Sequence, residues 1–173
     1  MKINEFIEQT LKMAQRGLRK SVEDLNPGEL EWKPGPESNP VGFILWHMAR
    51  AEDAMINSIA RGGQPQLWET EKWHEKSGMS ADANDTGLMY TAEQVASFKI
   101  PELSVLLDYQ DAVRGQSLEY VRGMEPANFE EKVQFPFGPE ITKGRMFTML
   151  ISEVYQHWGQ IAYLRGLMRG LNK

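Results

Sequence analysis

Glu153 and His157 stand four residues apart in the stretch S-E-V-Y-Q-H-W-G-Q-I. In a helix, this spacing places two side chains about 40° apart around the axis and about 6 Å apart along it. Apolar residues recur on the same face, at Met146, Met149, Leu150, Ile161, Leu164 and Met168. A carboxylate and an imidazole are costly to bury in such a stripe without partners. A bound metal ion would satisfy both.

A second histidine, His47, falls on the apolar stripe of another predicted helix, between Ile44 and Met48. Two neutral imidazoles and one carboxylate suit Zn²⁺ with a coordination position left open for water or substrate. The same set can hold Fe²⁺, Ni²⁺ or Mn²⁺, and the order of metal affinities does not choose between them. Gln160 follows on the same face as Glu153, where it can hydrogen-bond a ligand or lie in water near the end of the helix.

The residues alone leave other interpretations open. A histidine on an apolar stripe is commonly a hydrogen-bonded core residue, and a Glu–His pair four residues apart stabilises a helix without any metal. His74, between Trp73 and Glu75, is a further candidate, as an acid or base lining a pocket or as a fourth ligand. The alternative for His74 is an ordinary surface histidine.

Four long amphipathic helices are predicted to position these residues, because apolar side chains recur every three or four positions in four segments. The segments are residues 3–23, 40–61, 101–122 and 143–170. Asn39 and Thr142 are the expected N-caps of the second and fourth helices. Arg50, Glu52 and Asp53 lie outside the apolar stripe of the second helix, and we expect them to face solvent. Four such helices predict a four-helix bundle, formed by a single domain over residues 1–173.

The connection between the second and third long helices, residues 64–90, is long and irregular. A connection of this length is usually functional or contains short helices. We expect one short helix around residues 69–76 and another from Thr91 to Phe98, where T-A-E-Q matches a capping box. Residues 132–137 have an extended pattern, in which Pro136 argues against a central strand. Asn26-Pro27-Gly28 is expected to end the first helix.

Composition excludes several classes of protein. The 173 residues carry a net charge of −5 and no long basic run, which argues against a nucleic-acid surface. The absence of cysteine rules out disulfides, thiolate ligands and a cysteine nucleophile, and it is compatible with a cytoplasmic location. We find no signal-peptide pattern and no apolar run of membrane-spanning length. Five Trp and ten Met point to a lined pocket or an apolar contact between subunits.

Two motifs resemble the DinB-like (DNA-damage-inducible) family. The stretch N-P-V-G-F-I-L-W-H-M-A, which contains His47, is similar to the second helix of that family. The stretch H-W-G-Q-I, which begins at His157, is similar to the H-x-G-Q-I motif of the family and is followed by Arg165. The resemblance covers nearly the whole chain, with the two motifs in the expected order.

The resemblance implies an up-up-down-down four-helix bundle, often a homodimer, with a divalent metal near one end. The usual ligands are one histidine of the second helix and an H-x-x-x-H pair of the fourth, which correspond here to His47, Glu153 and His157. The chain departs from this pattern at Glu153. Relatives similar to mycothiol-dependent maleylpyruvate isomerase have a glutamate there, and the change lowers the charge of the site by one.

Relatives of this kind include isomerases and S-transferases that use mycothiol or bacillithiol. The resemblance therefore implies a metal-dependent enzyme that activates a low-molecular-weight thiol for transfer to, or isomerisation of, a small electrophile. We expect the segment from Trp68 to His74 to cover the pocket. A hydrolase that uses bound water, and a non-catalytic dimer with a structural metal, remain alternatives.

Overall fold

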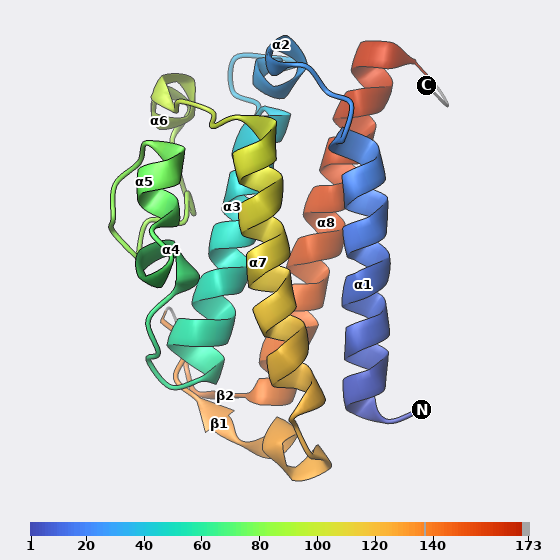
Figure 1. Cartoon of the computed structure of the whole chain (residues 1–173), viewed down its shortest axis with the longest axis vertical. Coiled ribbons are helices and arrows are strands. Elements are labelled where there is room, and N and C mark those ends of the chain that lie inside the picture. The colour runs from blue at the N-terminus through green and yellow to red at the C-terminus, as the bar shows by residue number, and fades with distance from the viewer. Residues whose placement is uncertain (137, 171–173) are drawn as a thin grey trace.

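The computed structural model describes residues 1–136 and 138–170. Four long helices form a bundle, and the second of them continues without a break as a π-helix, η1 (Figure 1). These elements are α1 (Ile3–Val22), α3 (Val41–Asp53) with η1 (Ala54–Ala60), α7 (Leu103–Arg122) and α8 (Lys143–Arg169). Around the bundle, α1 packs on α7 and α8, and α3 packs on the same two helices.

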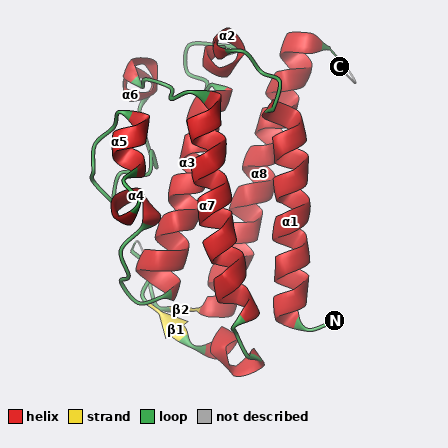
Figure 2. Cartoon of the chain, in the orientation of Figure 1, coloured by secondary structure: helices red, strands yellow, loops and turns green. Residues whose placement is uncertain are grey.

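Short elements connect the long helices (Figure 2). They are α2 (Pro27–Glu31), α4 (Leu67–Thr70), α5 (Trp73–Ser77), α6 (Ala92–Ser97), the 3₁₀ helix η2 (Pro126–Glu130), and the strands β1 (Lys132–Val133) and β2 (Ile141–Thr142). The two strands pair antiparallel to form a short hairpin. The predicted extended segment thus contributes only two residues to a strand, and its residue 137 lies outside the described residues.

Side-chain contacts fix the direction of each long helix. Tyr155 donates to the carbonyl of Thr10, and Arg165 pairs with Asp24, so α1 and α8 run parallel. Arg50 donates to the hydroxyl of Tyr109, and further along both helices the hydroxyl of Tyr120 donates to the carbonyl of Ala60 at the end of η1. The helices α3 and α7 therefore also run parallel. Since α1 ascends and α3 descends in Figure 1, the order is up, down, down, up.

The four-helix bundle is therefore confirmed, but the predicted up-up-down-down order is wrong. The connection that contains α2 stays at one end of the bundle, so the chain reverses direction between α1 and α3 (Figure 1). The connection that contains α4, α5 and α6 instead returns along the outside of the bundle to the end where α7 begins. This long crossover makes α3 and α7 parallel.

Residues 41–50 of α3 are all buried. The crossover covers α3 around Arg50 and Asp53, whereas Glu52 is buried against Arg114 of α7. Arg50, Glu52 and Asp53 were predicted to face solvent, and that prediction is wrong: at most 1% of each residue is exposed. The apolar stripe of α3 identifies the side that faces the bundle. The opposite side is covered by the connection over residues 64–90, which has no clear periodicity and therefore could not be predicted to pack there.

Side-chain N-caps begin three of the described helices, α2, α6 and α8. Thr142 accepts from the amide of Arg145 at the start of α8, and Thr91 accepts from the amide of Gln94 at the start of α6, as predicted. Asn26 begins the short helix α2 rather than only ending α1. The N-cap of α3 is Pro40, one residue later than predicted. The single short helix expected around residues 69–76 is two helices, separated at Lys72, whose φ is 57°.

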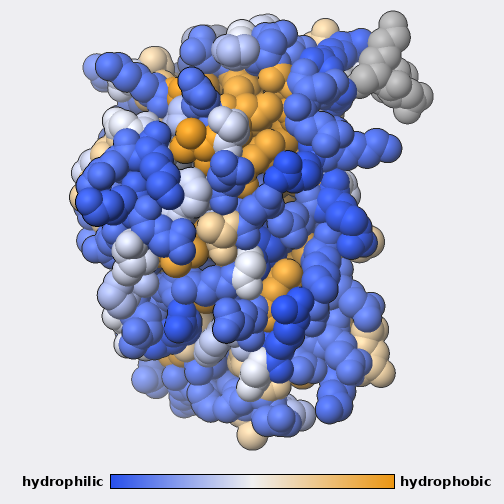
Figure 3. All heavy atoms as spheres, in the orientation of Figure 1, coloured by the Kyte–Doolittle hydropathy of each residue, from blue (hydrophilic) through white to orange (hydrophobic). Residues whose placement is uncertain are grey.

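The outer surface is mostly hydrophilic on the face that Figure 3 shows, with an apolar area between α7 and α1 near α2. The buried hydrophobic residues form one core cluster, to which all four long helices contribute. Among the described residues, no helix combines the length and hydrophobicity that are needed to cross a membrane.

Gly17 lets the indole of Trp158 pack directly on the backbone of α1. A Cβ at Gly17 would lie 2.1 Å from Cζ2 of Trp158, whereas a Cβ at Gly115 of α7 would meet nothing within 4 Å. Overpacking costs about 1–3 kcal/mol, while alanine gains about 1 kcal/mol over glycine in a helix. We expect Gly17→Ala to lower the free energy of unfolding and Gly115→Ala to raise it, measured by urea denaturation. A stabilised Gly17→Ala variant would contradict this packing.

Candidate metal centre

Three side chains from α3 and α8 converge at one point. Nε2 of His47 lies 3.0 Å from Oε1 of Glu153, and Nε2 of His157 lies 2.9 Å from the same oxygen. The two imidazole rings are nearly perpendicular, with their centres 5.0 Å apart. The three candidate ligand atoms all lie within 4.8 Å of one another. This separation lets one ion contact all three atoms after small side-chain movements, since metal–ligand bonds are about 2 Å long.

Each imidazole has a second partner on the side away from Glu153. Nδ1 of His47 donates to the carbonyl of Thr86 at 2.6 Å. Nδ1 of His157 lies 2.7 Å from Oε1 of Gln160, so the hydrogen bond to a candidate ligand is the one observed of the two alternatives for Gln160. Partners of this kind fix the tautomer of a metal-binding histidine and orient its ring. Both Nε2 atoms therefore face the common centre.

The hydrogen bonds of the three side chains leave a position that a cation could occupy. A neutral imidazole carries one N–H, and the fixed carbonyl of Thr86 takes that of His47. Nε2 of His47 then faces a carboxylate oxygen without a proton of its own. A metal ion at this point would satisfy both the imidazole nitrogen and the carboxylate oxygen. Two imidazole nitrogens and one carboxylate oxygen fit a divalent ion and leave at least one coordination position open.

The carboxylate of Glu153 is stabilised by its two histidine partners. Hydrogen bonds from His157 and then His47 lower the pKa of Glu153 to about 2, although partial burial acts in the opposite direction. Burial lowers the pKa of His157, but hydrogen bonds with Glu153 and Gln160 outweigh it and place the pKa above its ordinary value. The carboxylate is therefore ionised at neutral pH, which suits it to a cation.

A family model for the DinB superfamily matches residues 10–161. The chain belongs to the DinB superfamily. The match covers most of the bundle and includes all three converging side chains. It confirms the family resemblance of the two histidine motifs, whereas the metal itself stays a prediction.

A solved structure shares the fold over its whole length. It is described as the crystal structure of the conserved protein of locus from Enterococcus faecalis, and it superposes with a TM-score of 0.86 at 23% identity. The alignment covers 98% of this chain and 99% of that one. No curated protein matches the sequence. The structural neighbour therefore supports the helical-bundle fold and says nothing about activity.

The loop that touches the site lies later in the crossover than predicted. Thr86 contacts His47, and Phe43 stacks beside the His47 ring with centres 6.2 Å apart. His74 instead lies on α5, where its ring contacts Trp68 at 6.4 Å between centres. In the described part of the chain, His74 is not one of the three converging groups.

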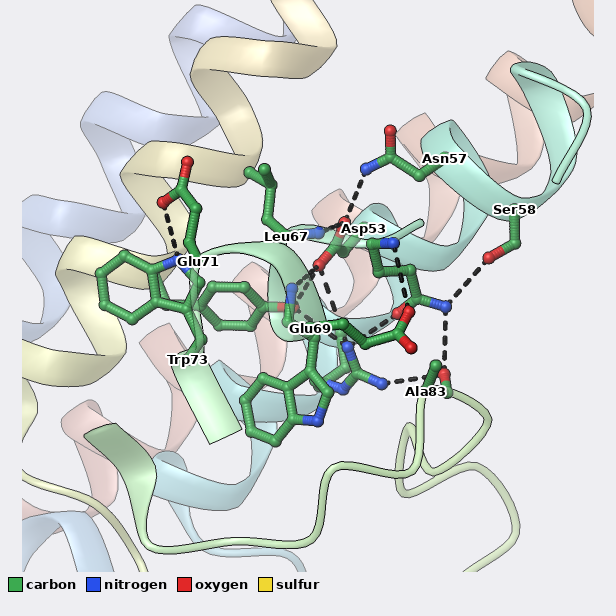
Figure 4. A network of polar contacts seen from close by, with 12 residues as sticks. Asp53, Asn57, Ser58, Leu67, Glu69, Glu71, Trp73 and Ala83 are labelled. Carbon is green, nitrogen blue, oxygen red and sulfur yellow. Dashed lines mark hydrogen bonds and ion pairs between the residues drawn. The ribbon is translucent and has the colours of Figure 1, made fainter. Parts of the chain in front are cut away.

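Sequence reasoning missed a buried polar network that joins α3 to this crossover (Figure 4). Asp53 accepts from the amides of Leu67 and Trp68, which begin α4, and from the hydroxyl of Tyr109. Burial, followed by the charge of Asp53, raises the pKa of Tyr109 well above its ordinary value. The run R-A-E-D at residues 50–53, with three charged residues among four, was the sequence signal that could have indicated a polar network in α3.

Hollows on the surface differ in their relation to the site. One of about 510 Å³ lies between the β1–β2 hairpin and α8, and its wall includes Met149, one helical turn before Glu153. Two others, of about 430 and 510 Å³, share Arg61, Tyr120 and Lys143. None of the three hollows is lined by His47, Glu153 or His157, but the hairpin hollow extends furthest along α8 toward them, to Met149.

Proposed function

We propose that this DinB-superfamily protein binds a divalent metal ion through His47, Glu153 and His157. The observation that carries the proposal is the convergence of their ligand atoms within 4.8 Å, in a donor set of two imidazoles and one carboxylate. Zn²⁺, Ni²⁺, Fe²⁺ and Mn²⁺ are all compatible with these ligands. Protein purified without a metal-chelating tag tests the proposal by elemental analysis.

We further propose that the protein is a metal-dependent enzyme. It would activate a low-molecular-weight thiol for transfer to, or isomerisation of, a small electrophile. When bound, a divalent ion with an open position lowers the pKa of a thiol or water that it contacts. The chain has no cysteine, so the thiol has to come from outside. Thr86 and Gln160 hold the rings of His47 and His157, so only small movements of the ligand side chains are needed to receive the ion.

The hairpin hollow is our proposed place for the small electrophile. Its wall combines the apolar side chains of Phe135, Ile141 and Met149 with the oppositely charged side chains of Glu140 and Arg145. Arg145 and Met149 precede Glu153 by two turns and one turn of α8. A substrate with an apolar body and a polar or charged group would match both parts of this wall.

The thiol activity is tested with metal-loaded and metal-free protein. Each form is incubated with mycothiol, bacillithiol, cysteine or glutathione and a chromogenic electrophile, and formation of the thioether is measured. We expect conjugation only with metal and with a preferred thiol. If metal is bound and no thiol is used, the thiol assignment is wrong, and a panel of ester, amide and phosphate substrates would then test for hydrolysis.

Metal affinity is expected to rise with pH. The pKa of His157 lies above its ordinary value of 6.5 in the metal-free protein, and the metal must displace that proton. The same shift stabilises the metal-free fold below pH 6.5, and this contribution disappears as pH rises through the higher, folded-state pKa. Zn²⁺ titrations and thermal melts at pH 6 and pH 9 would show tighter binding and a larger stabilisation by zinc at pH 9. Equal affinities at both values would contradict the raised pKa.

A further inference from the structure

Arg50 binds the segment of the crossover that leads directly to the candidate metal centre. Its Nε donates to the carbonyl of Asp85 at 3.1 Å, and its Nη2 donates to the carbonyls of Ala83 at 2.9 Å and Asp82 at 3.4 Å. The next residue after Asp85 is Thr86, whose carbonyl accepts from His47. Arg50 and His47 are three residues apart on α3 and therefore lie on neighbouring positions of one helix face.

The remaining bonds of Arg50 fix the guanidinium itself. Nη1 donates to Oε1 of Gln66 at 2.7 Å and to the hydroxyl of Tyr109 at 3.2 Å. The guanidinium also lies 4.4 Å from the ring centre of Trp68. A guanidinium has five N–H donors in a fixed planar fork, and these five acceptors match that number. Arg50 is fully buried, so water does not compete for the bonds.

The backbone after Thr86 is held equally closely. Gly87 has a φ of 78°, and a Cβ there would lie 2.6 Å from the ring of Trp46 and 3.0 Å from that of Phe43. A side chain at Gly87 would be strained by its backbone conformation and would push the loop away from α3. The position of the Thr86 carbonyl is thus constrained on both sides along the chain, by the bonds of Arg50 before it and by the packing of Gly87 after it.

We propose that Arg50 is a positioning residue that fixes the Thr86 carbonyl over His47 and so keeps the Nε2 lone pair of His47 directed at the metal. This inference rests on the proposed function, because it assigns Arg50 a role toward that metal. Figure 4 shows Ala83 and Ser58 at the edge of the network that anchors this loop to α3 and η1. Nδ1–H of His47 is retained only while a carbonyl acceptor stays within reach.

Arg50→Lys is the main test, because lysine keeps the charge and loses the planar fork. Arg114→Lys is the matched control: Arg114 is equally buried and binds Glu52 through two bonds, but its described partners are Glu52 and Leu11, away from the crossover. Both variants remove a buried guanidinium from the α3–α7 interface. Thermal melts of the metal-free proteins establish how far each is destabilised.

Zn²⁺ affinity is measured by competition with a chelating indicator. We expect Arg50→Lys to weaken binding about 10- to 100-fold, the usual effect of losing a partner that supports a metal ligand. We expect Arg114→Lys to leave the affinity close to the wild-type value at a similar loss of melting temperature. Gly87→Ala should weaken binding as Arg50→Lys does. Equal affinities of the Arg50→Lys and Arg114→Lys variants would overturn the proposal.

Nitrogen chemical shifts of the His47 ring in metal-free protein give a readout independent of the metal. We expect a hydrogen-bonded Nδ1–H of His47 in wild type and in Arg114→Lys, and loss of that hydrogen bond in Arg50→Lys. If wild type binds no Zn²⁺ but the Nδ1 hydrogen bond is lost only in Arg50→Lys, the positioning role stands and the metal assignment fails. If Arg50→Lys keeps the Nδ1 hydrogen bond, the positioning role fails even where Zn²⁺ binds.

Discussion

His47→Ala is expected to leave a folded protein that no longer retains a divalent ion. The substitution removes one of three ligand atoms and the only one from α3, so the remaining pair on α8 can hold an ion only from one side. Loss of a supporting partner alone costs about 10- to 100-fold in affinity, and loss of a ligand should cost more. Elemental analysis and Zn²⁺ competition titrations measure the effect.

The other two ligands provide internal comparisons. His157→Ala and Glu153→Ala should reduce metal content as His47→Ala does, whereas Glu153→Gln keeps the shape of the side chain and removes its charge. His74→Ala is the control, because His74 lies on α5 outside the cluster. Circular dichroism confirms the fold of each variant. Wild-type metal content in His47→Ala would show that the ion, if any, binds elsewhere.

Arg114→Met is expected to cause a large loss of stability. Arg114 donates to both carboxylate oxygens of Glu52, at 2.8 and 2.7 Å, and to the carbonyl of Leu11 at 2.6 Å. Both charged residues are about 1% exposed. Removal of one partner leaves the other charge buried without compensation, which costs about 3–5 kcal/mol. Urea denaturation gives the free energy of unfolding.

A double variant separates the ion pair from general packing. Glu52→Leu combined with Arg114→Met replaces both charges by apolar groups, and it should recover most of the stability lost in Arg114→Met alone. Glu75→Ala is the surface control: Glu75 pairs with Lys72, both side chains are more than half exposed, and such pairs contribute only about 0–1 kcal/mol. A loss in Arg114→Met as small as in Glu75→Ala would contradict the argument.

The sequence predicted the elements and the candidate site well wherever periodicity or spacing carried the information. The predicted apolar stripe of α1 is buried at Ile7, Leu11, Ala14, Leu18 and Val22, whereas Ile3 at its start is 46% exposed. The convergence of His47, Glu153 and His157 followed from two helix faces and a family resemblance. Gln160 was identified because its position on α8 shares the face of Glu153.

Helix order and the second layer over α3 were beyond this kind of reasoning. Helix periodicity specifies which side is buried but not the direction in which the next helix runs, so the parallel packing of α3 and α7 was missed. Arg50 and Asp53 have no apolar neighbour pattern that marks them as buried. Their partners are backbone groups of the crossover, such as the carbonyl of Ala83 and the amide of Trp68, which any sequence would supply.

The parallel arrangement of α3 and α7 has a consequence for folding kinetics. The two helices can pair only after the chain between residues 54 and 102 has returned along the outside of the bundle. Closing so long a loop lowers the entropy of the chain before any stabilising contact forms, and contacts between distant residues slow folding. The candidate ligands His47 and Glu153 are 106 residues apart in the sequence, so the site is assembled only once this step is complete. An ion that binds them would therefore retard unfolding and leave the folding rate largely unchanged.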